Sequence, residues 1–292
     1  MKLTYGVLAS GSLGASCLEK IHHARKISFV CCDKKSRLII DYCNTQGLPL
    51  YIGNPRGEQI KDFIKDKKTD VIICVNYLFI INQIILEHPR KYAINFHGSL
   101  LPKYRGRTPH VWAIINNERY TGITGHLMTE HCDEGDIIYQ EKIEISEEAT
   151  GAELLNLFTT RYPAIIEEVI QSIESDKIIL IGQDDTKATF FEKRSPDQGK
   201  INWSWQKERI RNWIRAQARP YPGAFTFYRD CKVVVHKAVY DEIGFHQNDV
   251  NGKIINVSGN EVVVKTPNGA LRLIEIEVNN NISFKIGEIF HD

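Results

Sequence analysis

The chain has 292 residues, of which 42% are hydrophobic and 25% are charged. These fractions are typical of a folded, soluble protein and exclude collagen-like, disordered and membrane-embedded classes. The formal net charge of +1 excludes a protein-wide positive field, so a nucleic-acid partner would need a local basic patch. A chain of this length predicts one large core and a second, smaller unit.

The cysteines and the N-terminal residues indicate the compartment. Seven cysteines are scattered along the chain, and neither their odd number nor their spacing fits a set of disulfides or a zinc site. We therefore expect reduced thiols and no metal. Residues 1–30 contain no basic leader with a long apolar stretch, and no apolar run approaches the roughly 18 residues of a membrane span. These features predict a cytoplasmic protein without a membrane partner.

The first strand is expected at residues 3–9, followed by a glycine-containing turn and a helix-like segment at residues 16–22. Glycine allows backbone N–H groups at a helix N-terminus to approach a phosphate. Ser10, Gly11 and Ser12 are therefore candidate phosphate contacts. The turn lacks the complete GxGxxG spacing, so a tight connection between strand and helix explains it equally well.

Apolar runs and helix-like segments alternate over the following stretch of chain. Strands are expected at residues 27–32, 48–52, 69–75 and 92–97, and helices at residues 35–46, 58–65 and 81–88. Because parallel strands need crossover helices, this alternation predicts an α/β fold with a doubly wound parallel sheet. Ligands bind such sheets beyond the carboxyl ends of the strands. We therefore expect residues 10–14, 76–78 and 95–99 to face one crevice.

An amide and an imidazole lie at the end of the last of these strands. Asn95 and His97 are two residues apart, so on an extended backbone their side chains share one face, while Ile94 and Phe96 point to the other. Both polar groups can therefore act on one atom. The loop at residues 98–109 is rich in Gly, Pro and basic residues, which favours a functional or mobile segment over a core element.

An acidic turn separates two further strands, expected at residues 121–128 and 137–140. Asp133 and Gly135 favour turn geometry, and a plain turn is about as plausible as a functional one. A carboxylate near an imidazole would orient the ring and stabilise its protonated form. This chemistry is the reason to consider Asp133 as a functional residue.

The second half of the chain changes in character. A long amphipathic helix is expected at residues 150–175, kinked or divided at Pro163, and another helix at residues 206–218. Short apolar runs then occur between Asp, Gly and Asn turns at residues 224–228, 232–239, 253–257, 261–265 and 270–278. These runs predict a small antiparallel barrel or sheet.

Three separated motifs resemble the folate-dependent formyltransferase family. They are Asn95-Phe96-His97-Gly98-Ser99-Leu100-Leu101-Pro102 with Tyr104-Arg105-Gly106-Arg107-Thr108-Pro109, then Thr121-Gly122-Ile123-Thr124, then Asp133-Glu134-Gly135-Asp136-Ile137-Ile138. Residues 196–203, 215–216 and 220–225 resemble the nucleotide-sugar N-formyltransferases, so the resemblance covers nearly the whole chain. It implies a Rossmann-like, mostly parallel sheet, the formyltransferase fold, in residues 1–203. A smaller, β-rich, OB-like domain is implied in residues 204–292.

The resemblance also implies a reaction. A formyl group would pass from 10-formyltetrahydrofolate to the amine of a nucleotide-linked amino sugar, with Asn95, His97 and Asp133 at the family's catalytic positions. Hydrogen bonds from Asn95 and His97 would stabilise the negative charge that develops on the formyl oxygen. The attacking amine must also lose a proton, which His97, or Asp133 directly or through a water, could accept. This chemistry requires neither a covalent enzyme intermediate nor a metal.

Binding residues are implied at two places. The pterin of the folate would lie against Tyr77, Leu78, His131 and Cys132. Cys132 could instead be a buried apolar side chain, and Tyr77 could contact the sugar or the base. The candidates for the diphosphate are Ser10, Gly11, Ser12, Ser99 and Arg105, for which turn chemistry and surface charge are the alternative explanations.

Three functions compete. The preferred substrate is a dTDP- or UDP-linked 4-amino-4,6-dideoxyhexose for surface polysaccharide such as lipopolysaccharide O-antigen, with the 3-amino isomer as a close alternative. Methionyl-tRNA formyltransferase shares the catalytic residues, but the near-neutral charge argues against a nucleic-acid partner. The third function is noncatalytic nucleotide binding on a Rossmann-like fold. A homodimer is expected because it is the commonest assembly.

Overall fold

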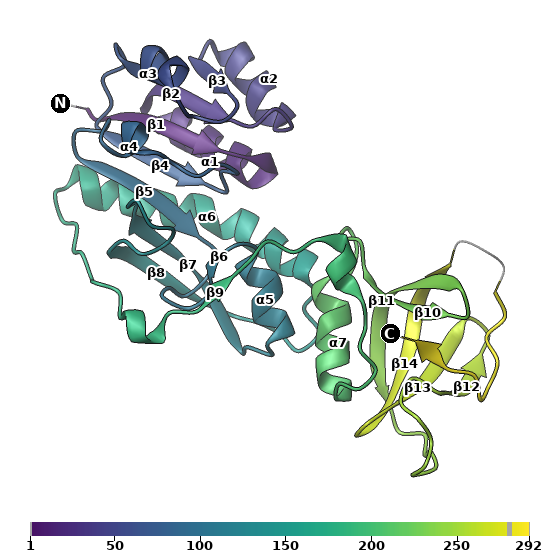
Figure 1. The fold of residues 1–292 in the computed structure, drawn as a ribbon. Coiled ribbons are helices and arrows are strands. Elements are labelled where there is room, and N and C mark those ends of the chain that lie inside the picture. Colours follow the sequence, from purple (N-terminus) through teal and green to yellow (C-terminus); the bar gives the residue numbers. More distant parts are fainter. Residues whose placement is uncertain (1, 279–281, 292) are drawn as a thin grey trace. The chain divides into compact units, whose positions relative to one another are not determined.

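The computed structural model describes residues 2–278 and 282–291. The chain divides into two compact units, one of Met1–Gly106, Thr121–Ile143 and Asn156–Phe191 and the other of Arg107–Tyr120, Glu144–Leu155 and Glu192–Asp292. Figure 1 shows the elements of both units. Among the described residues, no helix is both long and apolar enough to cross a membrane.

The first unit is built on a seven-stranded sheet with the order β3-β2-β1-β4-β5-β7-β8. These strands are β1 Thr4–Ala9, β2 Lys26–Cys32, β3 Leu50–Ile52, β4 Val71–Val75, β5 Tyr92–His97, β7 Tyr120–Leu127 and β8 Ile137–Glu144. The first five are parallel, and β7 pairs antiparallel with β5. The predicted mostly parallel α/β sheet is therefore confirmed. Chain order reverses between β1 and β4, which is where such sheets bind ligands.

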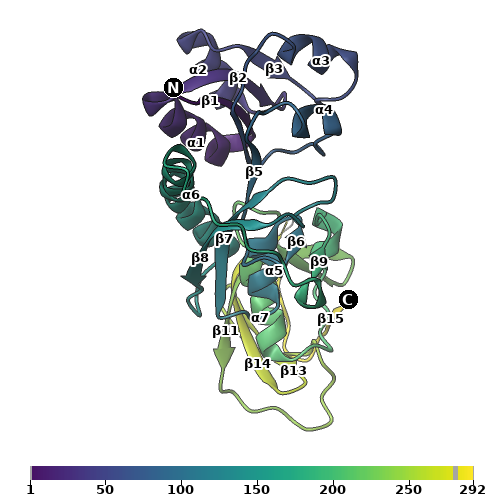
Figure 2. The same ribbon diagram turned by 90° about the vertical axis from the view of Figure 1, so that its left-hand side faces the viewer.

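Helices cover both faces of this sheet, as Figure 2 shows for α1 and α6 on one side and α3 and α4 on the other. The helices are α1 Gly11–Ala24, α2 Arg37–Gln46, α3 Glu58–Ile64, α4 Gln83–Leu86 and α6 Gly151–Glu174. Alternate residues of β1 serve the two faces, because side chains alternate along a strand. Leu8 joins a buried cluster with Ile60 of α3, whereas the hydroxyl of Tyr5 donates a hydrogen bond to Glu174 of α6.

The long helix was predicted at nearly the correct residues. Of the two alternatives expected at Pro163, a kink or a division, the division is wrong, because α6 runs as one helix from Gly151 to Glu174 with Pro163 inside it. Phe158, Tyr162, Ile166 and their neighbours on the same stripe are buried. Burial of a continuous apolar stripe stabilises the helix enough to offset the hydrogen bond that proline cannot make.

The second unit carries a six-stranded sheet with the order β12-β13-β14-β11-β10-β15. Its elements are α5 Pro109–Ile115, α7 Lys207–Ala216, β10 Ala224–Tyr228, β11 Cys231–Asp241, β12 Ile254–Ser258, β13 Glu261–Thr266, β14 Gly269–Val278 and β15 Phe290–His291. All the strand pairs given by register are antiparallel. The predicted antiparallel C-terminal sheet is confirmed, and its strands begin and end close to the apolar runs.

Three short elements complete the chain. They are β6 Arg105–Gly106, which pairs in parallel with β9 Phe190–Phe191, and the 3-10 helices η1 Asp185–Lys187 and η2 Pro196–Gly199. The pairing of β6 with β9 joins two segments that are far apart in sequence. It matters for the site described below.

The buried cluster under α3 allows a direct test of the fold. Replacing Ile72 of β4, which is 0% exposed in this cluster, by Ala should lower the free energy of unfolding by about 2–5 kcal/mol, because it leaves a cavity. The matched variant Ile52→Ala removes the same atoms from a side chain that is 43% exposed. It should cost about 0.5 kcal/mol or less. Urea denaturation followed by circular dichroism measures both, and equal losses would contradict this packing.

Candidate active site

The amide, imidazole and carboxylate singled out in the sequence lie together in the first unit. Asn95 and His97 stand at the end of β5, and Asp133 comes from the turn between β7 and β8. The Asn95 Nδ2 donates to Asp133 Oδ1 at 3.3 Å, and His97 Nδ1 lies 3.6 Å from Asp133 Oδ2. Asn95 and His97 therefore share a face, as the strand spacing predicted.

Hydrogen bonding fixes which nitrogen of His97 carries a proton. His97 Nε2 lies 2.7 Å from the backbone oxygen of Tyr104. A carbonyl oxygen only accepts hydrogen bonds, so Nε2 must be the donor. The lone pair of the neutral ring is therefore on Nδ1, the nitrogen that faces Asp133.

The Asp133 carboxylate is largely buried and is surrounded by donors. Gly106 N donates to its Oδ2 at 2.9 Å, and imidazole nitrogens of His97 and His126 lie 3.6 and 3.5 Å from its oxygens. Burial favours the neutral acid and raises the pKa. When His97 and His126 are protonated on the nitrogens that face Asp133, their charges and a His126 hydrogen bond, together with the Gly106 N–H, outweigh burial and hold the pKa of Asp133 far below its usual range.

His126 of β7 is a member of this cluster that the sequence analysis missed. Its Nδ1 donates to the Leu127 oxygen at 2.8 Å, so the neutral ring has its lone pair on Nε2. That Nε2 lies 3.1 Å from Asn95 Nδ2. The antiparallel register pairs Asn95 directly with His126. The alternation of inward and outward side chains along residues 121–128, combined with an antiparallel pairing of this strand with β5, would have placed His126 beside Asn95.

His126 sets the orientation of the Asn95 amide. With His126 neutral, the two hydrogens of Asn95 Nδ2 point to His126 Nε2 and to Asp133 Oδ1. The opposite orientation would place the amide oxygen against the carboxylate. Both Asn95 donors are therefore used within the protein, and donation to a ligand requires one of them to exchange partners.

The backbone around the cluster takes conformations that side chains disfavour. Tyr104 and Asp133 both have a φ of 61°, which is uncommon for residues other than glycine. Gly106 has a φ of 104°, and a Cβ there would lie 2.3 Å from the Phe191 oxygen. Such conformations persist where neighbouring contacts enforce them, and they concentrate at functional sites.

The residues predicted to hold the folate are divided between core and surface. Tyr77 is buried in the cluster under α3, and its hydroxyl donates to the Gly53 oxygen at 3.0 Å. Leu78 beside it is exposed. His131 and Cys132 are exposed in the turn that carries Asp133. The alternative that Cys132 is a buried apolar side chain is therefore wrong.

The residues predicted to hold the diphosphate lie in different surroundings. Gly11 and Ser12 are exposed at the start of α1, Ser10 is buried, and Asn76 Nδ2 donates to the Ser10 oxygen at 3.1 Å. This contact joins the loops after β1 and β4, as expected for a common crevice. Ser99 is buried and donates to the Lys103 oxygen at 2.7 Å.

Arg105 is only 1% exposed. Its guanidinium donates to Gln183 Oε1 and to Asp185 Oδ1, at 2.8 and 2.7 Å from Nη2, and pairs with Glu134 at 3.5 Å. Protein groups therefore surround it, and its contact with a diphosphate stays a prediction.

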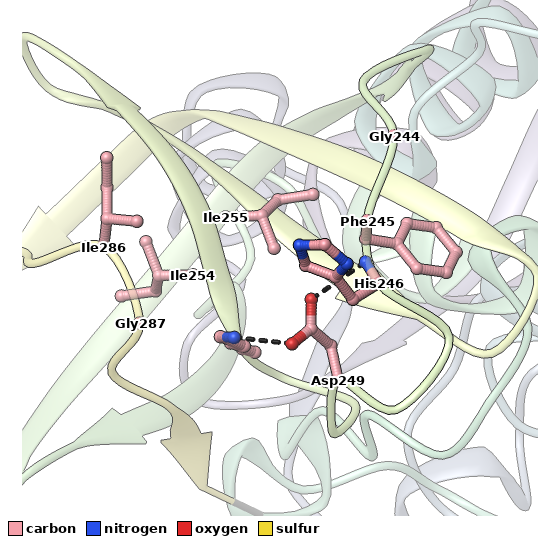
Figure 3. A pocket seen from close by; sticks show the side chains of 9 residues that line it. Gly244, Phe245, His246, Asp249, Ile254, Ile255, Ile286 and Gly287 are labelled. Atoms are coloured by element: carbon pink, nitrogen blue, oxygen red, sulfur yellow. Dashed lines mark hydrogen bonds and ion pairs between the residues drawn. The ribbon is translucent and has the colours of Figure 1, made fainter.

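A cavity of about 510 Å³ lies in the second unit (Figure 3). It is lined by Gly244, Phe245, His246, Asp249, Lys253, Ile254, Ile255, Ile286 and Gly287. The Asp249 carboxylate accepts a hydrogen bond from the backbone N–H of His246 at 3.1 Å and another from Lys253 Nζ at 2.5 Å. None of the residues predicted from the sequence lines it. Within residues 2–278 and 282–291, no three His, Cys, Asp or Glu side chains are placed to hold a metal ion.

Two curated relatives resemble this chain in sequence. The bifunctional polymyxin resistance protein ArnA of Wigglesworthia glossinidia brevipalpis is 32% identical over 281 residues, covering 91% of this chain and 41% of that protein. The chain thus spans about two fifths of the ArnA length. A methionyl-tRNA formyltransferase of Alkaliphilus oremlandii is 37% identical over 222 residues, covering 76% of this chain and 71% of that protein.

Two solved structures share the fold. One is WlaRD, a sugar 3N-formyl transferase in the presence of dTDP and 5-N-formyl-THF, with a TM-score of 0.74 and 17% identity over 97% of this chain and 100% of that one. The other is the N-formyltransferase of Helicobacter canadensis in complex with folinic acid and dTDP-3-aminofucose. It has the same TM-score and identity over 95% of this chain and 100% of that one.

Two family models match most of the sequence. The formyl transferase model matches residues 16–170, and the model of the formyl transferase C-terminal domain matches residues 193–291. The fold, the cluster at the end of β5 and these matches agree, and the chain belongs to the formyl transferase family.

Proposed function

We propose that this enzyme transfers the formyl group of 10-formyltetrahydrofolate to the amine of a nucleotide-linked amino-deoxy sugar. The observation that carries the proposal is the meeting of Asn95, His97 and Asp133 at the end of β5, in a chain of the formyl transferase family. Family membership sets aside the noncatalytic alternative.

The folate supplies an electrophilic formyl carbon, and the protein supplies the groups around it. Asn95 donates a hydrogen bond to the formyl oxygen after one of its N–H groups gives up its hydrogen bond to His126 or Asp133. Such exchanges are expected, because catalytic hydrogen bonds often tighten only when the substrate is bound. A donor aimed at the developing negative charge lowers the barrier more than it strengthens ground-state binding.

His97 and Asp133 handle the proton that the attacking amine loses. Nε2 of His97 is occupied as a donor to Tyr104, so Nδ1 is the ring nitrogen that can accept a proton. A proton on Nδ1 places the imidazolium 3.6 Å from the ionised Asp133, and this charge pair stabilises the protonated ring. Asp133 can also take the proton through a water.

The two exposed turns flanking these groups are proposed to hold the folate. Leu78 follows β4, and His131 and Cys132 precede Asp133. Because the Tyr77 side chain is buried and bonded to Gly53, we propose that this residue contributes its backbone. The exposed start of α1 at Gly11 and Ser12 remains the proposed diphosphate contact.

The sugar acceptor is supported by the extent of the similarities. The match to ArnA covers 91% of the chain, against 76% for the methionyl-tRNA formyltransferase. We propose a dTDP- or UDP-linked 4-amino-4,6-dideoxyhexose, with the 3-amino isomer as the alternative, for surface polysaccharide. A cytoplasmic homodimer with domains at residues 1–203 and 204–292 completes the proposal.

The methionyl-tRNA function is the second candidate, because that relative has the higher identity, 37%. The net charge of +1 argues against it, since binding of a polyanion depends on phosphate neutralisation by Lys and Arg.

The acceptor can be identified directly. Incubation with 10-formyltetrahydrofolate and a panel of dTDP- and UDP-linked 3-amino and 4-amino sugars should give a product 28 Da heavier by mass spectrometry, which is about the mass of a formyl group replacing hydrogen. Initiator methionyl-tRNA is the control acceptor. Formylation of the tRNA and of no sugar would overturn the proposal.

Substitution of the clustered residues should separate chemistry from binding. His97→Ala and Asp133→Asn should each lower kcat by about 100-fold or more, with a much smaller change in KM for the acceptor, because their roles belong to the transition state. His23→Ala, at an exposed position of α1, is the matched control and should keep wild-type kinetics. Unchanged kcat in both site variants would remove these residues from the reaction.

The lowered pKa of Asp133 predicts a pH-dependent stability. The unfolded carboxyl titrates near about 3.9, so the folded state gains stability from ionised Asp133 above that pH and loses it as pH falls towards the lower folded pKa. Below about pH 4 the wild type should therefore lose unfolding free energy relative to Asp133→Asn, which has no carboxyl at this position to titrate. Urea titrations from pH 7 to pH 3 measure it, with the exposed Asp197→Asn as control. A difference that does not change with pH would contradict this charge environment.

A further inference from the structure

The backbone of Tyr104 and of β6, which follows it directly, makes two contacts to the clustered residues. The Tyr104 oxygen accepts from His97 Nε2, and Gly106 N donates to Asp133 Oδ2. The position of residues 104–106 therefore constrains the position of both side chains. The backbone of Gly106 packs directly against Phe191, since a Cβ at Gly106 would lie 2.3 Å from the Phe191 oxygen.

Residues 183–191, here called the 183–191 segment, hold β6 in place. Thr189 accepts one hydrogen bond from Tyr104 N, at 2.8 Å to its Oγ1, and one from Arg105 N of β6, at 2.8 Å to its backbone oxygen. The Tyr104 ring stacks on Phe191 with a centroid distance of 4.8 Å. The left-handed conformation of Tyr104 thus depends on a segment about 85 residues later.

Gln183 begins this segment and joins it to the turn that carries Asp133. Its Nε2 donates to the backbone oxygens of Asp133 and Gly135, at 2.8 and 2.7 Å. Its Oε1 accepts from Nε and Nη2 of Arg105, at 3.2 and 2.8 Å. All the hydrogen-bonding capacity of one amide is used, and only this orientation satisfies it, because a carbonyl accepts and a guanidinium donates.

The turn is confined on its other side as well. A Cβ at Gly135 would lie 2.0 Å from the Leu127 oxygen, and Leu127 N donates to the Asp136 oxygen at 2.9 Å. The turn is therefore held between β7 and Gln183. Removing the amide of Gln183 leaves one of these two sides open.

We propose that Gln183 is a positioning residue for formyl transfer, which fixes the backbone of Asp133 against β6 and thereby sets the spacing between Asp133 and His97. Arg105 serves the same arrangement through its side chain, by linking Gln183 to Asp185 and Glu134. Misplacement of a reacting group by about 1 Å can cost about 100-fold in rate. Loss of the Gln183 hydrogen bonds should therefore lower kcat more than loss of an ordinary surface hydrogen bond would.

Two variants remove different hydrogen bonds of Gln183. Gln183→Leu removes both sets of hydrogen bonds. Gln183→Glu keeps the acceptor for Arg105 but, when ionised, presents a carboxylate to the Asp133 and Gly135 oxygens. With the acceptor found in the panel, both should lower kcat about 10- to 100-fold, with KM for either substrate changed less than about threefold and with a folded circular dichroism spectrum.

The matched control is Lys187→Ala in the same segment. Its side chain is 71% exposed and pairs with Asp184, so kcat should stay at the wild-type value. Wild-type kcat in either Gln183 variant would overturn the proposal. So would an equal loss in Lys187→Ala, or a Gln183→Glu variant as active as wild type at pH 8.

A second readout needs no acceptor, so failure of the proposed sugar does not affect it. In ¹⁵N NMR of histidine side chains, the Gln183→Leu and Gln183→Glu variants should shift the imidazole signals of His97 and His126 while leaving that of His22 in place. His22 pairs with Tyr42 in another part of the first unit. Unshifted His97 and His126 signals in both variants would overturn the positioning role.

Discussion

The site depends on keeping an ionised carboxylate away from water. Transfer of a charged group into a poorly solvated position is costly unless donors and opposite charges surround it. Asp133 obtains these from three separate places, the end of β5 with Asn95 and His97, β7 with His126, and the backbone of Gly106. No single segment could supply them. The order of the strands, with β5 beside β7, brings the first two places together, and the pairing of β6 with β9 holds the third.

The same requirement explains the backbone around the cluster. Tyr104 must direct its carbonyl to His97 while Gly106, two residues later, directs its N–H to Asp133. The positive φ of Tyr104 and of Asp133 costs about 1–3 kcal/mol at each position. The β6–β9 pairing and the Gln183 amide offset this cost. Gln183, Thr189 and Phe191 therefore support the site although they lie far from it in the sequence.

Much of this arrangement could be read from the sequence because it depends on local patterns. The alternation of strands and helices predicted the sheet, and the spacing of Asn95 and His97 predicted a shared face. Asp133 could be assigned only through the family resemblance, since an acidic turn by itself is ambiguous. His126 and Gln183 could not be found from local patterns, because their roles arise from an antiparallel register and from contacts 31 and 50 residues along the chain. Pro163 does not divide its helix, because tertiary packing outweighs the local preference of proline.

Residues outside the cluster of Asn95, His97 and Asp133 must decide which amine acceptor is bound. In the proposed reaction, Asn95, His97 and Asp133 interact with the formyl group and the amine, which sugar and tRNA acceptors share. What differs is the number of phosphates, and positive charge near the site decides how many can be bound. Arg105, the middle cation of the basic loop, is neutralised by Asp185 and Glu134, so it adds little to an attractive surface. A loop that uses one of its cations to hold its own shape suits a short diphosphate better than a long polyanion.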